Sequence, residues 1–263
     1  MDAALEARPS RRRRRRPRPG WVPNQHGAWA MLVLPLAVGA LRSGPGWMHL
    51  WLLLAWLLGY FTFFATGLWL RSGRKPRYRA PVVTYASVTA VVGGGLLAVQ
   101  PGLLRWGVVY APLLATSLWF SARRAERDLV NDVLTVAAAS LMVVVAFGLR
   151  DDDAWLPGSG SASAWVLAAV VFGYFVGTAL YVKTMIRERG NPAMYAASVG
   201  HHAAAALAAL WLLPPVGLLA AVLALRAALV PRLRPGARPL TIGLGEIAAS
   251  LTLGVLLVLV PLG

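Results

Sequence analysis

Three side chains that can exchange a proton near neutral pH stand within or beside long apolar segments. They are His26, at the start of the first such segment, His202 in the seventh and Glu246 in the ninth. Ionisable groups in such positions are costly and are typical of functional sites. Glu246 has no basic residue within reach on its own segment, so it either pairs with an arginine from another helix or does acid–base work. We therefore take His26, His202 and Glu246 as the candidate catalytic residues.

Polar residues elsewhere in three segments are spaced four or seven positions apart, which places them on one face of a helix. Because arginine and lysine bind phosphate and carboxylate groups well, we predict that these faces bind an anionic small molecule. The alternative is that the polar residues only join the helices by hydrogen bonds. The predicted ligand-binding residues are Asn24, Gln25, Arg127, Asn131, Asp132, Lys183, Arg187, Asn191 and Tyr195.

No metal site is predicted. Asp128 and Asp132 are four residues apart, a spacing that can hold Mg²⁺ on a diphosphate, but neighbouring arginines compete for both carboxylates. His201 and His202 point about 100° apart on a helix, so they rarely reach one ion. The chain has no cysteine, which excludes disulfides and thiol chemistry. No cofactor is predicted, and metal binding near Asp128 and Asp132 is left open.

The composition of the chain identifies the elements that must position these residues. Of 263 residues, 58% are hydrophobic and 14% charged, and the mean hydropathy is +0.61. A water-soluble domain has about 25% charged residues, so this chain predicts an all-α polytopic membrane protein. Its apolar blocks predict nine transmembrane helices, at residues 27–41, 47–70, 80–99, 103–120, 129–149, 164–186, 193–213, 216–230 and 242–261.

The positive charge predicts the orientation of these helices. Apart from Arg42, Arg105 and Arg150, every Lys and Arg falls in the N-terminal tail or near the even-numbered connections. By the positive-inside rule the N-terminus is cytoplasmic and the C-terminus external. Topology also explains the net charge of +16, so nucleic acid is not an expected partner. We predict a disordered Arg-rich cytoplasmic tail at 1–22 and one transmembrane domain at 23–263.

Three stretches together resemble the YwiC-like family of bacterial membrane proteins. They run from Pro23 to Trp29, from Glu126 to Asp132 and from Lys183 to Asn191. The resemblance implies a bacterial inner-membrane location and supplies no reaction. A looser analogy is to the UbiA-type prenyltransferases, which also have nine spans and a cavity facing the cytoplasm. In those enzymes the connections are rich in Asp, whereas the same connections are basic here. The analogy therefore extends to the architecture, a UbiA-like bundle, and not to Mg²⁺–diphosphate chemistry.

The leading functional hypothesis is a polar cavity, open to the cytoplasm, that binds an anionic or lipid-linked small molecule. If the protein is an enzyme, transfer to or from an isoprenoid or lipid substrate is the expected reaction class. One alternative is a proton-coupled transporter, with Glu246 and His202 as a proton relay. Another is an accessory or assembly protein of the membrane without catalytic activity. Membrane lipids are the expected surroundings, and no protein partner is predicted.

Overall fold

The structure of the chain is a computed structural model, which describes residues 20–23, 27–149 and 162–261. Within these ranges the chain is helical and contains no strand. The helices are α1 (Ala28–Ser43), α2 (Trp47–Arg71), η1 (Pro76–Tyr78), α3 (Arg79–Val99), η2 (Pro101–Trp106), α4 (Gly107–Ala122), α5 (Leu129–Ser140), α6 (Met142–Phe147), α7 (Ala162–Ile186), α8 (Pro192–Leu212), α9 (Pro214–Leu233) and α10 (Pro239–Leu259).

Each predicted apolar block forms a helix at the expected place, and seven helical segments are long and apolar enough to cross a membrane. The fifth block is divided, because the helix turns at Leu141 and continues as α6. α1 is shorter, with 16 residues. α8 is not among the seven, because its two histidines lower a mean hydropathy that its many alanines raise only moderately. The chain is therefore a multi-pass helical membrane protein, as predicted.

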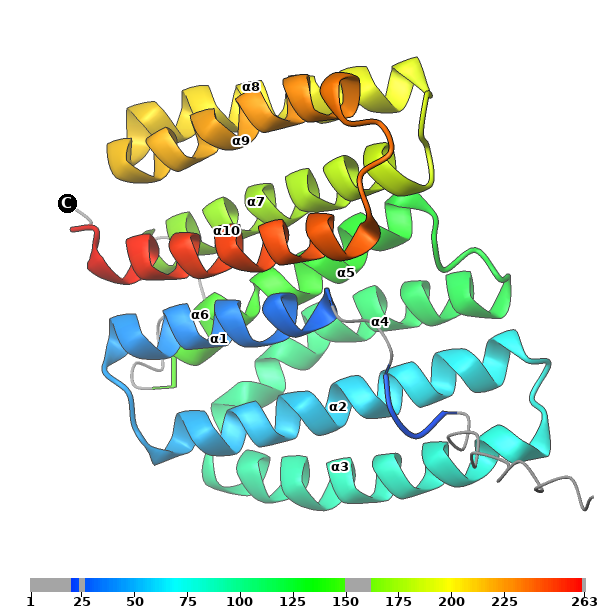
Figure 1. Cartoon of the computed structure of the whole chain (residues 1–263). Coiled ribbons are helices and arrows are strands. Elements are labelled where there is room, and N and C mark those ends of the chain that lie inside the picture. The colour runs from blue at the N-terminus through cyan, green and yellow to red at the C-terminus, as the bar shows by residue number, and fades with distance from the viewer. Residues whose placement is uncertain (1–19, 24–26, 150–161, 262–263) are drawn as a thin grey trace, which may run out of the picture.

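The helices lie side by side with their long axes close to parallel (Figure 1). α8 and α9 form an antiparallel hairpin at one edge, α2 and α3 lie at the other, and α10 lies between α9 and α1. The first and last helices are therefore neighbours. Arg42 at the end of α1 joins them by donating Nη1 hydrogen bonds to the carbonyls of Val258 (3.2 Å) and Val260 (2.8 Å).

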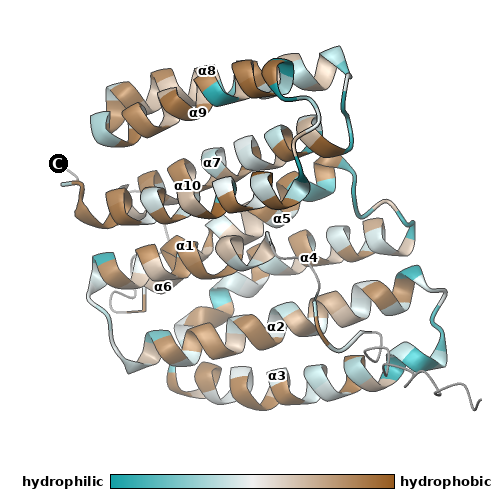
Figure 2. Ribbon diagram, in the orientation of Figure 1, coloured by the Kyte–Doolittle hydropathy of each residue, from teal (hydrophilic) through white to brown (hydrophobic). Residues whose placement is uncertain are grey.

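The core lies where α1, α6 and α7 meet. Val143 and Val144 of α6 and Leu167 of α7 are fully buried there. Gly39 of α1 makes this close approach possible, because a Cβ at that position would stand 2.2 Å from the carbonyl oxygen of Val143. Most of the other helices expose apolar side chains outward, as expected where lipid is the solvent (Figure 2).

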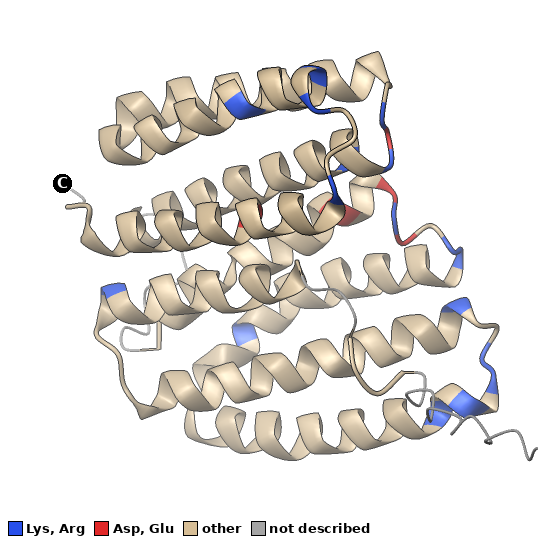
Figure 3. Cartoon of the chain, in the orientation of Figure 1, with Lys and Arg blue, Asp and Glu red and all other residues tan. Residues whose placement is uncertain are grey.

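Lysine and arginine gather at one end of the bundle (Figure 3). We call this the basic end; it carries the connections α2–α3, α4–α5, α7–α8 and α9–α10. These are the connections that the charge pattern predicts to be cytoplasmic. Local sequence explains how the helices begin here: Asp128 and Asn191 cap α5 and α8, and prolines open α8 and α10. The orientation of the basic end in the membrane stays a prediction.

Candidate functional site

The predicted residues of the first segment, Asn24, Gln25 and His26, lie outside the described residues. Their proposed roles in ligand binding and catalysis therefore stay predictions. The other predicted site residues fall into three groups on α5, α7, α8 and α10. All three groups lie in the half of the bundle nearer its basic end.

The first group joins α7 to the α4–α5 connection. Lys183 is 8% exposed, and its Nζ lies 2.9 Å from Oδ2 of Asp132 and donates to the carbonyl of Arg127 at 2.5 Å. Both predicted ligand-binding residues Lys183 and Asp132 are thus engaged with each other. Arg187, one turn further along, is exposed. In this arrangement the charge of Lys183 is balanced within the protein.

Asn131 and Glu126 extend this group toward α2. The Nδ2 of Asn131 donates to the carbonyl of Glu126 at 2.8 Å, while its Oδ1 is buried without a hydrogen-bond partner among the described residues. Glu126 pairs with Arg71 of α2. Partial burial alone would raise the pKa of Glu126, but the hydrogen bond from Arg71 and the charges of Arg71 and Arg127 outweigh it, and the pKa lies below its ordinary value. The ion pair therefore persists at neutral pH.

The second group lies around the start of α8. The Oδ1 of Asn191 accepts hydrogen bonds from the backbone N–H groups of Ala193 (3.0 Å) and Met194 (3.3 Å), which makes Asn191 a helix cap. The hydroxyl of Tyr195 donates to the carbonyl of Ala228 in α9 at 2.8 Å. The guanidinium of Arg232 stands over the Tyr195 ring, 4.6 Å from its centroid.

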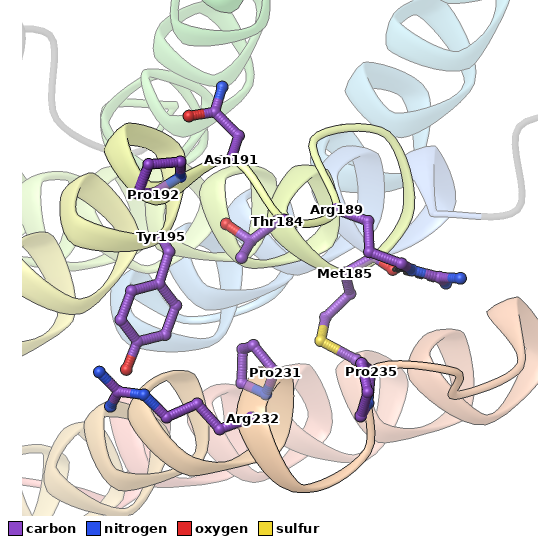
Figure 4. A pocket seen from close by; sticks show the side chains of 10 residues that line it. Thr184, Met185, Arg189, Asn191, Pro192, Tyr195, Pro231, Arg232 and Pro235 are labelled. Atoms are coloured by element: carbon purple, nitrogen blue, oxygen red, sulfur yellow. Dashed lines mark hydrogen bonds between the residues drawn. The ribbon is translucent and has the colours of Figure 1, made fainter.

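Asn191 and Tyr195 line a pocket of about 310 Å³ between the α7–α8 and α9–α10 connections. Tyr195 and Arg232 reach toward each other from α8 and α9, and Met185 extends from α7 toward Pro235, whereas the guanidinium of Arg189 points to the side opposite that of Arg232 (Figure 4). Among the residues that the structure describes, neither Arg189 nor Arg232 pairs with a carboxylate. The lining residues are Thr184, Met185, Arg189, Gly190, Asn191, Pro192, Tyr195, Pro231, Arg232 and Pro235.

Arg189 and Arg232 were not among the predicted ligand-binding residues. Both were counted only as topology determinants, because each follows the end of an apolar block. The signal that could have found them is their position beside Asn191 and Pro231, where two connections approach each other at the same end of the bundle.

The third group lies deeper and centres on Glu246 of α10. Its Oε1 is 2.7 Å from Nη2 of Arg226, and its Oε2 accepts a hydrogen bond of 2.9 Å from Thr178 of α7. The sequence left open whether Glu246 pairs with an arginine from another helix, and the structure provides that partner. Arg226 lies within α9, in the predicted span 216–230, seven residues before the helix ends at Leu233.

His202 and His201 both face α7. The Nδ1 of His202 is 2.7 Å from the carbonyl of Ser198, and its ring packs against Gly177, where a Cβ would stand 3.1 Å from Nε2. His201 Nε2 is 2.8 Å from the carbonyl of Gly173. His202 and Glu246 therefore approach neighbouring positions of α7, Gly177 and Thr178, from different helices. In the described part of the chain, no group of three or more metal-ligating side chains occurs.

Comparisons with known proteins agree on one family. A protein-family model described as YwiC-like protein matches residues 22–147. The uncharacterised protein YwiC of Bacillus subtilis is 33% identical over 185 residues, which cover 69% of this chain and 73% of that protein. An uncharacterised protein of Haemophilus influenzae is 29% identical over 194 residues, covering 71% of this chain and 76% of that protein. No solved structure matches the chain.

Proposed function

The chain belongs to the YwiC-like family, and we propose that, as a multi-pass membrane protein, it binds the anionic group of a small or lipid-linked molecule at its basic end. The observation that carries this proposal is the pocket of about 310 Å³ with Arg189 and Arg232 in its wall. Neither arginine has a described carboxylate partner, so their positive charge is available to a ligand; Arg189 donates its Nε and Nη2 to the carbonyl of Met185 at 3.1 and 2.9 Å and has its remaining N–H groups for this purpose. A guanidinium fork binds phosphate and carboxylate oxygens through two parallel hydrogen bonds.

The other lining groups complete a site of mixed character. Thr184, Asn191 and Tyr195 supply polar atoms, whereas Met185 and the prolines at 231 and 235 supply apolar surface. Binding pockets for small molecules combine apolar walls with a few polar groups in this way. The pocket lies where α7 and α9 end and α8 begins, so a ligand with an apolar chain could keep its anionic group here and its chain beside the helices.

Transfer of a group to or from such an anionic or lipid-linked molecule remains the reaction class that we propose. In this proposal Lys183 and Asp132 form an ion pair that holds the end of α7 in place. They do not bind the anion, because each neutralises the charge of the other. Arg127 and Arg187 are exposed at the same end and would attract an anion. His202 and Glu246 would act as acid–base or orienting groups deeper in the bundle.

The test compares two probes with the full chain in detergent: hexyl phosphate, which carries an apolar chain, and inorganic phosphate, which does not. A double variant, Arg189→Ala with Arg232→Ala, should weaken binding of hexyl phosphate at least tenfold. Arg234→Ala is the matched control, because Arg234 is exposed at the same end and does not line the pocket.

If the wild type binds hexyl phosphate more tightly than inorganic phosphate, the natural ligand is lipid-linked. Equal affinity for the two probes would favour a free anion. Mass spectrometry of lipids that copurify with the wild type and are lost from the double variant would then name the molecule. Unchanged binding of both probes in the double variant, or equal loss in Arg234→Ala, would overturn the proposal, since charge at this end rather than the pocket would be responsible.

A further inference from the structure

A second polar site lies inside the bundle, between three helices, α7, α9 and α10. We call it the inner cluster and define it as Thr178, Tyr181, Arg226 and Glu246. Counted from the basic end at about 1.5 Å per residue, Thr178 is about 12 Å inside α7, and Arg226 and Glu246 are each about 10 Å inside α9 and α10. The three helices thus bring these residues to the same depth. A charge pair at this depth is costly, and such residues are kept for a function.

The guanidinium of Arg226 is only partly used in this structure. Nη2 faces Oε1 of Glu246 at 2.7 Å, and the group lies over the ring of Tyr181, 4.2 Å from its centroid. Nε is buried and has no hydrogen-bond partner among the described residues. A guanidinium carries five N–H donors, and a buried donor without a partner is unfavourable. Arg226 therefore has the capacity to hold an anion more completely than it holds Glu246.

The inner cluster and the pocket are linked along one face of α7. Tyr174, Thr178, Tyr181 and Met185 follow each other at intervals of three or four residues, which places them on one face of the helix. Met185 lines the pocket, while Tyr181 contacts Arg226 and Thr178 contacts Glu246. Tyr181 of the inner cluster and Met185 of the pocket also belong to one small apolar cluster, together with Ala227 and Ile242.

From this arrangement we infer that Arg226 is an inner oxyanion-binding site, at which a phosphate, sulfonate or carboxylate group replaces Glu246 while Glu246 takes up one proton. The charges balance. Before exchange, the guanidinium is neutralised by the Glu246 carboxylate; afterwards, it is neutralised by one negative charge of the ligand, and Glu246 is a neutral acid that can keep its hydrogen bond with Thr178. This inference goes beyond the pocket at Arg189 and Arg232, because it assigns a separate site and couples it to protons.

The groups around Glu246 make it the acceptor of this proton. From α7 it faces Tyr174, whose hydroxyl lies 3.3 Å from the Glu246 carbonyl, and Tyr181. From α9 it faces Arg226, and from α8 the nearest titratable side chain is His202, which lies within range of the Arg226 charge. α1 also packs against α10, but its Arg42 binds carbonyls at the opposite end. Glu246 is therefore the only described carboxylate at this place.

The experiment measures proton uptake when the full chain in detergent binds hexanesulfonate. A sulfonate stays ionised over the whole working range, so any proton taken up belongs to the protein. Calorimetry in two buffers of different ionisation enthalpy gives the number of protons directly. We expect up to one proton per bound sulfonate, and an apparent Kd that rises up to tenfold per pH unit once Glu246 is ionised in the free protein.

Three variants assign the groups. Glu246→Gln should bind hexanesulfonate without proton uptake, with a Kd that is independent of pH. Arg226→Gln should weaken binding at least tenfold. Glu126→Gln is the control: it removes a different carboxylate, one that pairs with Arg71 outside the inner cluster, and should retain the proton uptake of the wild type. If Glu246→Gln does not fold, calorimetry of the wild type in the two buffers still decides whether sulfonate binding is coupled to proton uptake.

Absence of sulfonate binding, binding without proton uptake in the wild type, or loss of the uptake in Glu126→Gln would each overturn the inference. So would unchanged affinity in Arg226→Gln. The outcome separates the two sites: binding that is lost in the Arg189→Ala, Arg232→Ala variant and shows no proton uptake would support the pocket and refute the inner site.

Discussion

Replacing Gly217 with alanine tests how tightly the hairpin of α8 and α9 is packed. Gly217 lies in the first turn of α9, opposite Leu210 of α8. A Cβ added at Gly217 would stand 2.4 Å from Cα and 2.5 Å from the backbone N of Leu210. Ordinary carbon contacts are about 3.5–4.0 Å, so the two helices would have to separate by about 1 Å. Backbone atoms cannot rotate away as a flexible side chain would.

Two opposing terms set the size of the effect. Alanine is favoured over glycine inside a helix by about 0.5–1 kcal/mol. Overpacking in a well-packed contact costs about 1–3 kcal/mol, and the upper part of that range applies because the clash is with backbone. We therefore expect Gly217→Ala to lower the free energy of unfolding by about 1–2 kcal/mol. Gly200→Ala, in the same hairpin, should raise it by about 0.5–1 kcal/mol, because nothing lies within 4 Å of its added Cβ.

The assay is reversible unfolding in mixed micelles at increasing SDS, followed by tryptophan fluorescence, with thermal unfolding as a second measurement. Gly200→Ala controls for the change in helix propensity, so the difference between the two variants isolates the contact with Leu210. Equal stability of the two variants would refute the reasoning, since it would mean that the hairpin is not closed at Gly217.

Three further outcomes are expected. Glu126→Gln should lower the free energy of unfolding by about 0.5 kcal/mol at neutral pH, because it breaks the partly exposed pair with Arg71. Since the pKa of Glu126 is lowered in the folded protein, the pair stabilises the fold at pH values above the ordinary pKa of 4.5. The difference in stability from the wild type should therefore shrink as the pH falls below that value. A reporter fused after Arg124 should be cytoplasmic and one after Gly46 external, and the reverse result would invert the topology. Deleting residues 1–20 should leave the amount of membrane-inserted protein unchanged, and its loss would show that later arginines do not suffice for orientation.

The positions of the helices could be predicted because the lipid solvent leaves a strong pattern in the sequence. Long blocks of apolar residues predict each span, and in the structure the caps at Asp128 and Asn191 mark where α5 and α8 begin. The break at Leu141 could not be predicted, because Ser140 and Leu141 sit in an apolar run without glycine or proline. The segment after it, α6, packs closely against α1, and the sequence does not reveal a contact between residues about a hundred positions apart.

The candidate site was predictable only in part, because residue spacing gives the face of a helix but not its neighbour. Lys183 and Asp132 were both selected as ligand-binding residues, and it takes the tertiary structure to show that they bind each other. Arg226 was missed as the partner of Glu246 for a related reason. The predicted span 216–230 contains Arg226, but a span does not reveal which helix packs beside it, so Arg226 could not be chosen among the arginines as the partner of Glu246.

The contact of Arg42 with the carbonyls at the end of α10 has a consequence for the order of synthesis. α1 is the first helix to leave the ribosome, and α10 follows after ~200 further residues. At about 5–20 residues per second, α1 waits roughly 10–40 s for this neighbour. During that interval its α10-facing side must be covered by lipid or by an insertion factor. A nascent chain that stops before Pro239 would leave Arg42 without these two acceptors, so this contact forms only once α10 has been made.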